Sequence, residues 1–450
     1  MLNRTIKPEP FDQISFTLPE IEKFKLENDL DVFFVRRNHL PILRFNLILE
    51  SGSKYDPAGK KGMINLFSML LDEGAGDYDA LQLNEEFDLL GSNFDISPNN
   101  DNLFISLRTL KENRDESLKL FSDVICRPHL NIDDFAREQR KILTRIMQLN
   151  DDPDEIANIV FEYYLFGGND AYAYPVIGYK NDVLSTTSED MKYVYDNYFS
   201  PSGAGIIVVG DADKDEIKDK LNYYLSSWKT TRQSTAVLNS TNNMERKIIL
   251  VHKENSVQSE IRIGHLSSKR SSPDYFEKSI LNTILGGQFS SRINLNLREN
   301  KGYTYGAFSR FNYYKNAAYF FVSTSVNAEN TGNAVREIIK ELNGIRDGVS
   351  EAELDFAKSS LIRKFPSNFE TNRQIAANIS TLIVHSLPDE FFDSYLENIR
   401  EISAGGVNKA AAENIFPDDA VIVIVGDKTK LKGQLNEFNR EIIEVDLPVV

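Results

Sequence analysis

Cysteine is almost missing from this chain, which has 450 residues and a single cysteine, Cys126. One thiol excludes an internal disulfide and a cysteine-based zinc cluster. Cys126 lies in the apolar run LFSDVICRP, residues 120–128. This setting favours a core position over a nucleophilic role for the thiol.

Long hydrophobic runs are also missing. No stretch of about 18 apolar residues occurs, so we expect no membrane-spanning helix and no membrane partner. The opening residues, MLNRTIKPEPFDQISF, have neither the apolar centre of a secretory signal nor the arginine-rich pattern of a transit peptide. We therefore expect a cytoplasmic location, or a periplasmic one if a leader has been removed.

Positive charge is in short supply. The chain has 51 Lys and Arg against 67 Asp and Glu, which gives a formal net charge of −16. Nucleic acid is therefore excluded as an expected partner, because the basic residues that would neutralise its phosphates are outnumbered. An acidic surface suits basic peptides, but acidity also serves solubility alone.

Histidine is scarce, with five residues in the chain. None lies three to five positions from another, so no local pair of imidazole ligands exists. The glycine-rich segment GAGIIVVGDAD, residues 203–213, lacks the GxxxxGK[ST] pattern of a phosphate-binding loop. The sequence thus contains no self-contained metal or nucleotide motif.

What the sequence does contain is an internal repeat. Residues 198–217 and 415–431 share an aromatic residue, a proline, an apolar run and Gly-Asp. The glycines of the two Gly-Asp pairs, Gly210 and Gly426, are 216 positions apart (426 − 210). A strand with a polar turn recurs at a similar spacing in 43–56 and 259–272, which predicts two copies of one domain.

The repeat defines the domain organisation that we predict. One domain spans 1–228, a linker rich in Ser, Thr and Asn spans 229–244, and the second domain spans 245–450. In each half, strands come first, helices follow, and a strand closes the unit. We therefore predict an α+β protein of two homologous domains, each a mainly antiparallel sheet with helices packed on one face. The expected helices are 62–73, 112–126, 132–149, 151–167, 276–285 and 350–364.

Five segments follow one another along the chain: ILESGSKYDPAGKKGMINLFSMLLDEG, LNEEFDLLGSNFDISPNNDNLFISL, CRPHLNIDDFAREQRKILTRIMQLNDDP, AYPVIGYKNDVLSTTSEDMKYVYDNYFSPSGAGIIVVGD and GGQFSSRINLNLRENKGYTYGAFS. In this order they resemble the peptidases of the pitrilysin and mitochondrial processing peptidase family, the inverted zinc proteases or M16 family. The resemblance covers nearly the whole chain. It implies the fold predicted above and, for typical members, zinc-dependent peptide hydrolysis.

The zinc chemistry of that family requires H-x-x-E-H on a helix, because residues i and i+4 share a helix face and can hold one ion. Aligned on GMINLFSMLLDEG, the two histidine positions hold Asn65 and Met69, and the glutamate position holds Ser68. The family's downstream glutamate ligand falls on Ile146. These four residue types suit no single metal. The resemblance thus implies a degenerate zinc motif, with no metal and no cofactor held by this chain; the alternative is that Asn65 and Ser68 are ordinary polar residues on a packed helix.

A second family feature is retained. Members carry an arginine followed seven positions later by a tyrosine, after a glycine-rich turn, and Arg298 and Tyr305 match this spacing. We expect a helix that ends near Gly302, followed by a strand with Tyr303, Tyr305 and Ala307 on one face. The resemblance implies that Arg298 and Tyr305 bind substrate carbonyls and stabilise an oxyanion; taken alone, an Arg near a helix end and a Tyr in a strand are ordinary.

The resemblance implies a subunit of a heterodimer. In the family's short-chain pairs one subunit keeps zinc and the other keeps Arg and Tyr, and the two enclose a chamber for peptide substrate. Our hypothesis is that this chain is the zinc-less subunit and that a zinc-bearing sister is its partner. The alternatives are a non-catalytic scaffold with the same fold and, less favoured, an active peptidase with an unusual metal or nucleophile. The segment GSNFDIS, residues 91–97, matches the family's edge strand beside the substrate, or is a routine strand.

Overall fold

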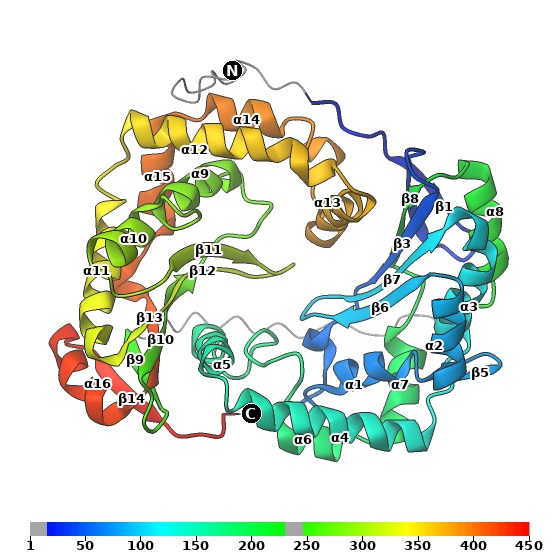
Figure 1. The fold of residues 1–450 in the computed structure, drawn as a ribbon, viewed down its shortest axis with the longest axis horizontal. Helices are drawn as coiled ribbons and strands as arrows, with labels where there is room; N and C mark the ends of the chain where they lie inside the picture. Colours follow the sequence, from blue (N-terminus) through cyan, green and yellow to red (C-terminus); the bar gives the residue numbers. More distant parts are fainter. Residues whose placement is uncertain (1–15, 230–245, 450) are drawn as a thin grey trace, which may run out of the picture.

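The computed structural model describes residues 16–229 and 246–449, and Figure 1 shows them as two halves, each built on one large sheet. The predicted linker 229–244 lies outside the described residues except for Lys229. The domain boundaries at 228 and 245 therefore stay a prediction. No helix in the described ranges is long and apolar enough to cross a bilayer.

The first half contains a six-stranded sheet in the order β1-β2-β8-β3-β7-β6. The strands are β1 (Glu22–Lys25), β2 (Asp31–Arg36), β3 (Ile42–Leu49), β6 (Asn93–Pro98), β7 (Leu103–Leu110) and β8 (Gly205–Gly210), and a small ribbon is formed by β4 (Gly74–Ala75) and β5 (Tyr78–Asp79). The helices are α1 (Met63–Leu70), α2 (Ala80–Leu89), α3 (Arg114–Cys126), α4 (Ile132–Leu149), α5 (Pro153–Phe166), α6 (Lys180–Ser185), α7 (Ser188–Tyr198) and α8 (Lys214–Leu225), with 3₁₀ turns η1 (Ser53–Tyr55) and η2 (Lys111–Asn113).

The second half contains a sheet in the order β11-β12-β10-β13-β9-β14. Its strands are β9 (Lys247–His252), β10 (Gln258–Leu266), β11 (Ala307–Tyr313), β12 (Ala318–Asn327), β13 (Val421–Gly426) and β14 (Glu441–Val445). The helices are α9 (Tyr275–Leu285), α10 (Arg292–Asn294), α11 (Thr331–Gly344), α12 (Glu351–Lys364), α13 (Asn372–His385), α14 (Tyr395–Glu401), α15 (Ala404–Asn414) and α16 (Lys428–Leu435), together with the π-helical segment η3 (Leu295–Asn300) and 3₁₀ turns η4 (Ala328–Asn330), η5 (Phe365–Phe369), η6 (Asp389–Phe391), η7 (Pro417–Asp419) and η8 (Asn436–Phe438).

The two sheets share one topology. Five strands of the first, β2-β8-β3-β7-β6, correspond in order to β9-β13-β10-β12-β11 of the second. In both, the strand that ends at the Gly-Asp pair runs parallel to one neighbour and antiparallel to the other. The predicted fold class, α+β with two homologous and mainly antiparallel units, is confirmed.

Each half also covers the sheet of the other, a feature that the sequence did not indicate. Helix α13 of the second half packs on the first sheet, where Ile379 and Leu382 join a core with Ile48 and Ile207. Helix α5 of the first half packs on the second sheet through residues such as Phe161. Figure 1 shows these two helices between the sheets. Both sheets are thus covered on two faces, which explains why GIIVVG and VIVIVG are buried at every residue.

The stability of the folded chain should fall at acid pH because of the imidazole of His265. Its Nδ1 lies 2.9 Å from the Leu266 carbonyl oxygen and must donate, while Nε2 accepts from the Phe416 N–H at 3.1 Å. The ring is therefore held neutral, and burial lowers its pKa to about 4. Below pH 6.5 the unfolded chain binds a proton that the folded chain does not, so stability falls as pH falls from 6.5 to 4.

We expect this residue to remove about 3 kcal/mol of stability across that range. The measurement is the urea midpoint between pH 7.5 and 4.5 for the wild type, for His265→Gln and for His39→Gln, in which the replaced imidazole is exposed. The His265 variant should lose the part of the acid dependence that His265 supplies, and the His39 variant should keep all of it. His385, whose pKa is also lowered by burial to about 4, supplies a further part in all three proteins. Equal slopes in all three proteins would contradict the assignment.

Candidate functional site

Helix α1, which corresponds to the family's metal helix, starts at a fixed position. The Asp56 carboxylate accepts from the N–H groups of Gly62 at 2.7 Å and Ile64 at 2.9 Å, and burial raises its pKa to about 7. Gly62 has φ 93°, and a side chain there would meet the Ile177 carbonyl oxygen at 2.4 Å. Glycine is therefore required where the helix begins.

Two of the degenerate motif residues share one side of α1. Asn65 and Met69 are half-buried, and Ser68 between them is buried. The Ser68 hydroxyl donates to the Asn65 carbonyl oxygen at 2.7 Å, one turn earlier in the same helix. The hydroxyl is thus satisfied within its own helix and does not point a free donor at a ligand.

The fourth motif residue, Ile146, is 1% exposed and lies in the core of the first half, on α4, which packs against α1. The structure therefore brings these two helices together as the family's metal centre requires. The side chains at the four positions are an amide, a bonded hydroxyl, a thioether and an alkyl group. Such a set does not fit zinc, which takes imidazole, thiolate or carboxylate ligands. The described residues contain no group of three or more His, Cys, Asp or Glu able to hold a metal.

Two acidic residues beside these helices are already paired with cations. Glu138 of α4 is almost fully buried and lies 3.2 Å from Arg137 and 2.7 Å from Lys141. Glu73, just after α1, forms an ion pair with Arg137 as well, and its burial raises the pKa of its carboxyl group. These carboxylates are held by side-chain ammonium and guanidinium groups, and this arrangement supports packing rather than ligation of a metal.

Strand β6 lies at the end of the first sheet and pairs only with β7 among the described strands. Of the two alternatives for residues 91–97, the position at a sheet edge is therefore the one observed, while a place beside a substrate stays a prediction. The unpaired backbone groups on the other side of β6 are able to accept an added strand.

The candidate Arg298 lies in the opposite half, in η3. Its guanidinium carbon is 4.4 Å from the centre of the Phe289 ring, and its Nε is 3.4 Å from Glu299. The side chain is 37% exposed, so it is steadied on an aromatic face and still open to solvent. Gly302 ends this segment with φ 65°, which confirms the expected helix end.

The candidate Tyr305 is 92% exposed, and the strand expected around it is absent. Strand β11 begins only at Ala307, because a local turn precedes it: Thr304 Oγ1 donates to the Gly306 carbonyl oxygen at 2.8 Å and accepts from its N–H at 3.0 Å. The prediction that Tyr303, Tyr305 and Ala307 share a face is therefore wrong. Tyr303 packs on the second core and Ala307 is buried, whereas Tyr305 projects into solvent.

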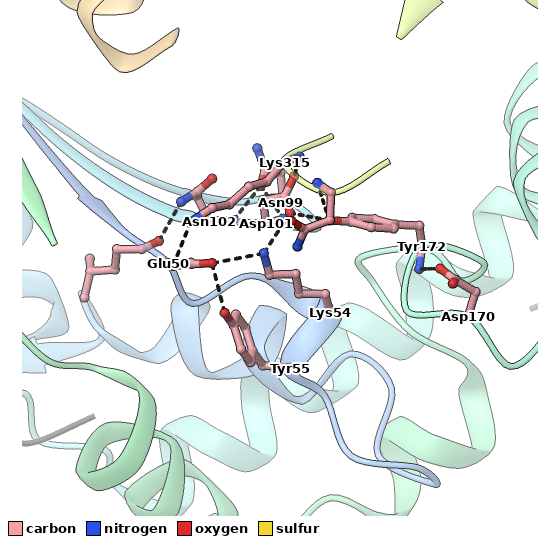
Figure 2. Close-up of polar contacts among 11 residues, drawn as sticks. Glu50, Lys54, Tyr55, Asn99, Asp101, Asn102, Asp170, Tyr172 and Lys315 are labelled. Carbon is pink, nitrogen blue, oxygen red and sulfur yellow. Dashed lines mark hydrogen bonds and ion pairs between the residues drawn. The ribbon is translucent and has the colours of Figure 1, made fainter. Parts of the chain in front are cut away.

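A buried polar cluster joins the two halves, and sequence analysis missed it (Figure 2). Lys54 Nζ lies 2.9 Å from Asp101 and 3.3 Å from Glu50, with only 1% of the Lys54 side chain exposed. Tyr172 donates to Asp101 at 2.6 Å. The backbone N–H of Lys315, from the β11–β12 turn of the second half, donates to the other Asp101 oxygen at 2.7 Å, and its ammonium lies 2.9 Å from Glu50.

The tip of the β11–β12 hairpin extends this cluster. Tyr314 stacks on Tyr172 with ring centres 4.5 Å apart and donates to Glu162 at 2.6 Å. Tyr319 donates to the same Glu162 oxygen at 2.7 Å, and burial raises the pKa of Glu162. These contacts fix the hairpin of one half against α5 and the β3–α1 loop of the other. The sequence carries only a weak signal for this cluster, because Asp101 lies in an Asn-rich segment that resembles an ordinary polar turn.

Comparisons with known proteins agree with this architecture. The family description "Insulinase (Peptidase family M16)" matches residues 36–165, and "Peptidase M16 inactive domain" matches residues 185–361. Among curated relatives, the "Non-peptidase homolog YmxG" of Helicobacter pylori is 22% identical over 408 residues, which is 89% of this chain and 93% of that protein. An "Uncharacterized zinc protease" of Rickettsia felis is 24% identical and covers 89% of this chain and 96% of its own length.

Two solved structures share the fold. A "peptidase M16 inactive domain" from Pseudomonas fluorescens superposes with a TM-score of 0.85 at 23% identity, over 90% of this chain and 98% of that one. A protease from Helicobacter pylori gives a TM-score of 0.82 at 21% identity, over 91% of this chain and 100% of that one. The first description lies within the first half, and the second runs from residue 185, at the end of α6 in the first half, to residue 361 in α12 of the second. The chain therefore belongs to the peptidase M16 family.

Proposed function

We propose that this chain is the zinc-less subunit of a heterodimeric M16 peptidase. The observation that carries the proposal is the donor set at the family's metal position. Asn65, Ser68, Met69 and Ile146 do not fit zinc, while the helices that would hold the ion remain packed together. The metal helices have kept their fold after losing their ligands, as expected when a sister subunit supplies the hydrolytic metal.

The role proposed for this chain is to bind the peptide and stabilise charge in the partner's site through Arg298 and Tyr305. The exposure of Tyr305 and the half-exposed Arg298 guanidinium support this role, because both groups are able to reach a molecule outside the chain. A phenol O–H and a guanidinium both donate hydrogen bonds, and neither needs to change its protonation state to bind a developing oxyanion.

The first test is reconstitution. The purified chain alone should cleave no peptide and should contain well below one equivalent of zinc by elemental analysis. Addition of a zinc-bearing M16 sister of similar length should give cleavage that a chelator abolishes and that exceeds the sister's own rate.

Other outcomes are informative. Chelator-sensitive cleavage by the chain alone would overturn the proposal. Co-purification with a large assembly, with no gain of cleavage when any zinc-bearing sister is added, would instead support the scaffold function. A control is the triple variant with Asn65→His, Ser68→Glu and Met69→His. This variant should still not cleave peptide by itself, because it has no carboxylate at position 146 to complete the set of zinc ligands.

A further inference from the structure

Four arginines line one open pocket in the first half. Arg37, Arg44, Arg108 and Arg373 are part of the wall of a cavity of about 540 Å³, which we name the arginine pocket. The concentration of positive charge contrasts with the chain's net charge of −16. A local reversal of sign of this kind marks a surface that favours anions.

The strand register places two of these arginines side by side. Arg44 of β3 is directly opposite Arg108 of β7, and Arg108 is directly opposite Asn93 of β6. Side chains opposite one another on neighbouring strands point to the same face, so the three residues form one row across the sheet. Like charges directly opposite on paired strands are destabilising. The fold thus carries a repulsive pair that packing alone does not explain.

The arginines form no ion pair within the described ranges, although Glu370 also lines the pocket. Among the described residues, the buried Nε of Arg44 has no hydrogen-bond partner either. Burial and the nearby Arg373 lower the pKa of Arg44, and Asp95 only partly opposes them. A guanidinium that is partly desolvated and unpaired is costly, and a bound anion would relieve that cost.

The pocket is held in shape by its walls. Arg37 donates to the carbonyl oxygens of Phe369, at 3.3 Å, and Glu370, which precede α13. The Asn372 amide donates to the Val209 carbonyl oxygen of β8 at 3.4 Å. The start of α13, with its own Arg373, is thereby fixed against the sheet that carries Arg44 and Arg108. The site is preorganised, so little ordering is required when a ligand binds.

The pocket opens beside the free edge of β6. Strands in a sheet are about 4.8 Å apart, so a peptide added to β6 would lie about 10 Å from β7. A residue of that peptide opposite Asn93 would extend the row that contains Arg108 and Arg44. The long arginine side chains can lean across Asn93 toward it. A peptide on this edge is thus positioned to present a side chain to the arginine pocket.

We propose that the arginine pocket binds a carboxylate of a peptide that adds to β6, and so gives the chain a preference for acidic peptides. The inference rests on the proposed function only in requiring that a peptide binds this chain. It reverses the expectation from net charge, under which basic peptides are favoured. The carboxylate has two sources, an acidic side chain or a free C-terminus, and paired arginines accept either through bidentate hydrogen bonds.

The test is direct binding to the isolated full-length chain, measured by fluorescence anisotropy. Three labelled decapeptides of one β-forming sequence are used: one with a central Glu and an amidated end, one with Gln at that position and an amidated end, and one with Gln and a free carboxylate. We expect one or both carboxylate peptides to bind at least tenfold more tightly than the neutral peptide. The peptide that binds more tightly than the neutral one shows whether the carboxylate comes from a side chain or from the C-terminus.

The variants are Arg108→Gln and Arg373→Gln, both of exposed residues, with Arg140→Gln on the outer surface of α4 as the charge-matched control. The first two should reduce the carboxylate preference to about twofold or less, and the control should keep it. Arg108→Gln should also raise the melting temperature without ligand, because it removes the repulsion with Arg44.

The inference would be overturned by equal binding of the three peptides, by no binding of any of them, or by a preference that both pocket variants retain. Tight binding of inorganic phosphate without peptide preference would also overturn it, in favour of a phosphate site. Cleavage of the neutral peptide by the chain together with its zinc-bearing sister is measured in a separate experiment. The proposed function can therefore hold even if this inference fails.

Discussion

Tyr305→Phe is expected to lower the kcat of the proposed heterodimer about 10²- to 10³-fold, because in the role that we propose for Tyr305 it removes one donor to the developing oxyanion. The side chain is 92% exposed and contacts no core, so the free energy of unfolding of the chain itself should not change. The measurement is kcat and KM of peptide cleavage at saturating partner, together with the melting temperature of the variant. A loss of kcat with an unchanged melting temperature separates a chemical role from a structural one.

Arg298→Ala should act on the same step and also weaken substrate binding. Because its guanidinium stacks on Phe289, Arg298→Lys keeps the charge and loses the planar contact, and it should recover only part of the activity. Tyr223→Phe is a matched control, since that tyrosine is 76% exposed on α8. Unchanged kcat/KM in both Tyr305→Phe and Arg298→Ala would remove the proposed role.

The fold could be predicted because its signals are local and repeated. The Gly-Asp strands, 216 residues apart, and the capped helix at Pro153 are patterns of short range, and they correspond to β8, β13 and α5. The edge position of β6 was one of the two alternatives that the sequence left open for residues 91–97. Helix ends were less well predicted: the expected helix 62–73 ends at Leu70.

The exchange of helices between halves could not be predicted from periodicity. An apolar stripe shows that a helix packs on something, but it does not show which sheet it covers. Helix α5 follows α4 directly in the chain and yet belongs to the second core through Phe161 and Val160. Only the three-dimensional arrangement distinguishes this from packing within one domain.

At the candidate site, residue identity was predictable and backbone geometry was not. The absence of zinc ligands at the family's metal positions could be recognised from the sequence, because the spacing of those ligands in the family is fixed. Tyr305 was assigned to a strand that was expected to follow the helix end near Gly302, and the hydrogen bonds between Thr304 and Gly306 form a turn that delays this strand to Ala307. The arginine pocket could not be predicted because the register of β3 and β7 places Arg44 beside Arg108, and Arg373 joins them only where α13 packs on the first sheet.

Asp101→Asn is expected to lower the free energy of unfolding by about 3–5 kcal/mol, because it leaves the buried Lys54 ammonium without its main counter-charge. Glu50, at 3.3 Å and 21% exposed, remains near Lys54 and keeps the loss toward the lower end. The same substitution weakens the bond from the Lys315 N–H, so the contact between the two halves weakens with it.

Urea unfolding followed by the fluorescence of Trp228, the only tryptophan in the sequence and 1% exposed in the first half, is the measurement. The double variant Lys54→Met, Asp101→Asn should recover part of the lost free energy of unfolding, since removing both charges costs less than leaving one buried charge unpaired. Glu437→Gln, which breaks a surface pair with Arg336, is the control and should cost less than about 1 kcal/mol. If Asp101→Asn costs no more than this control, the cluster is not what holds the two halves together, and the contacts of α5 and α13 must do so alone.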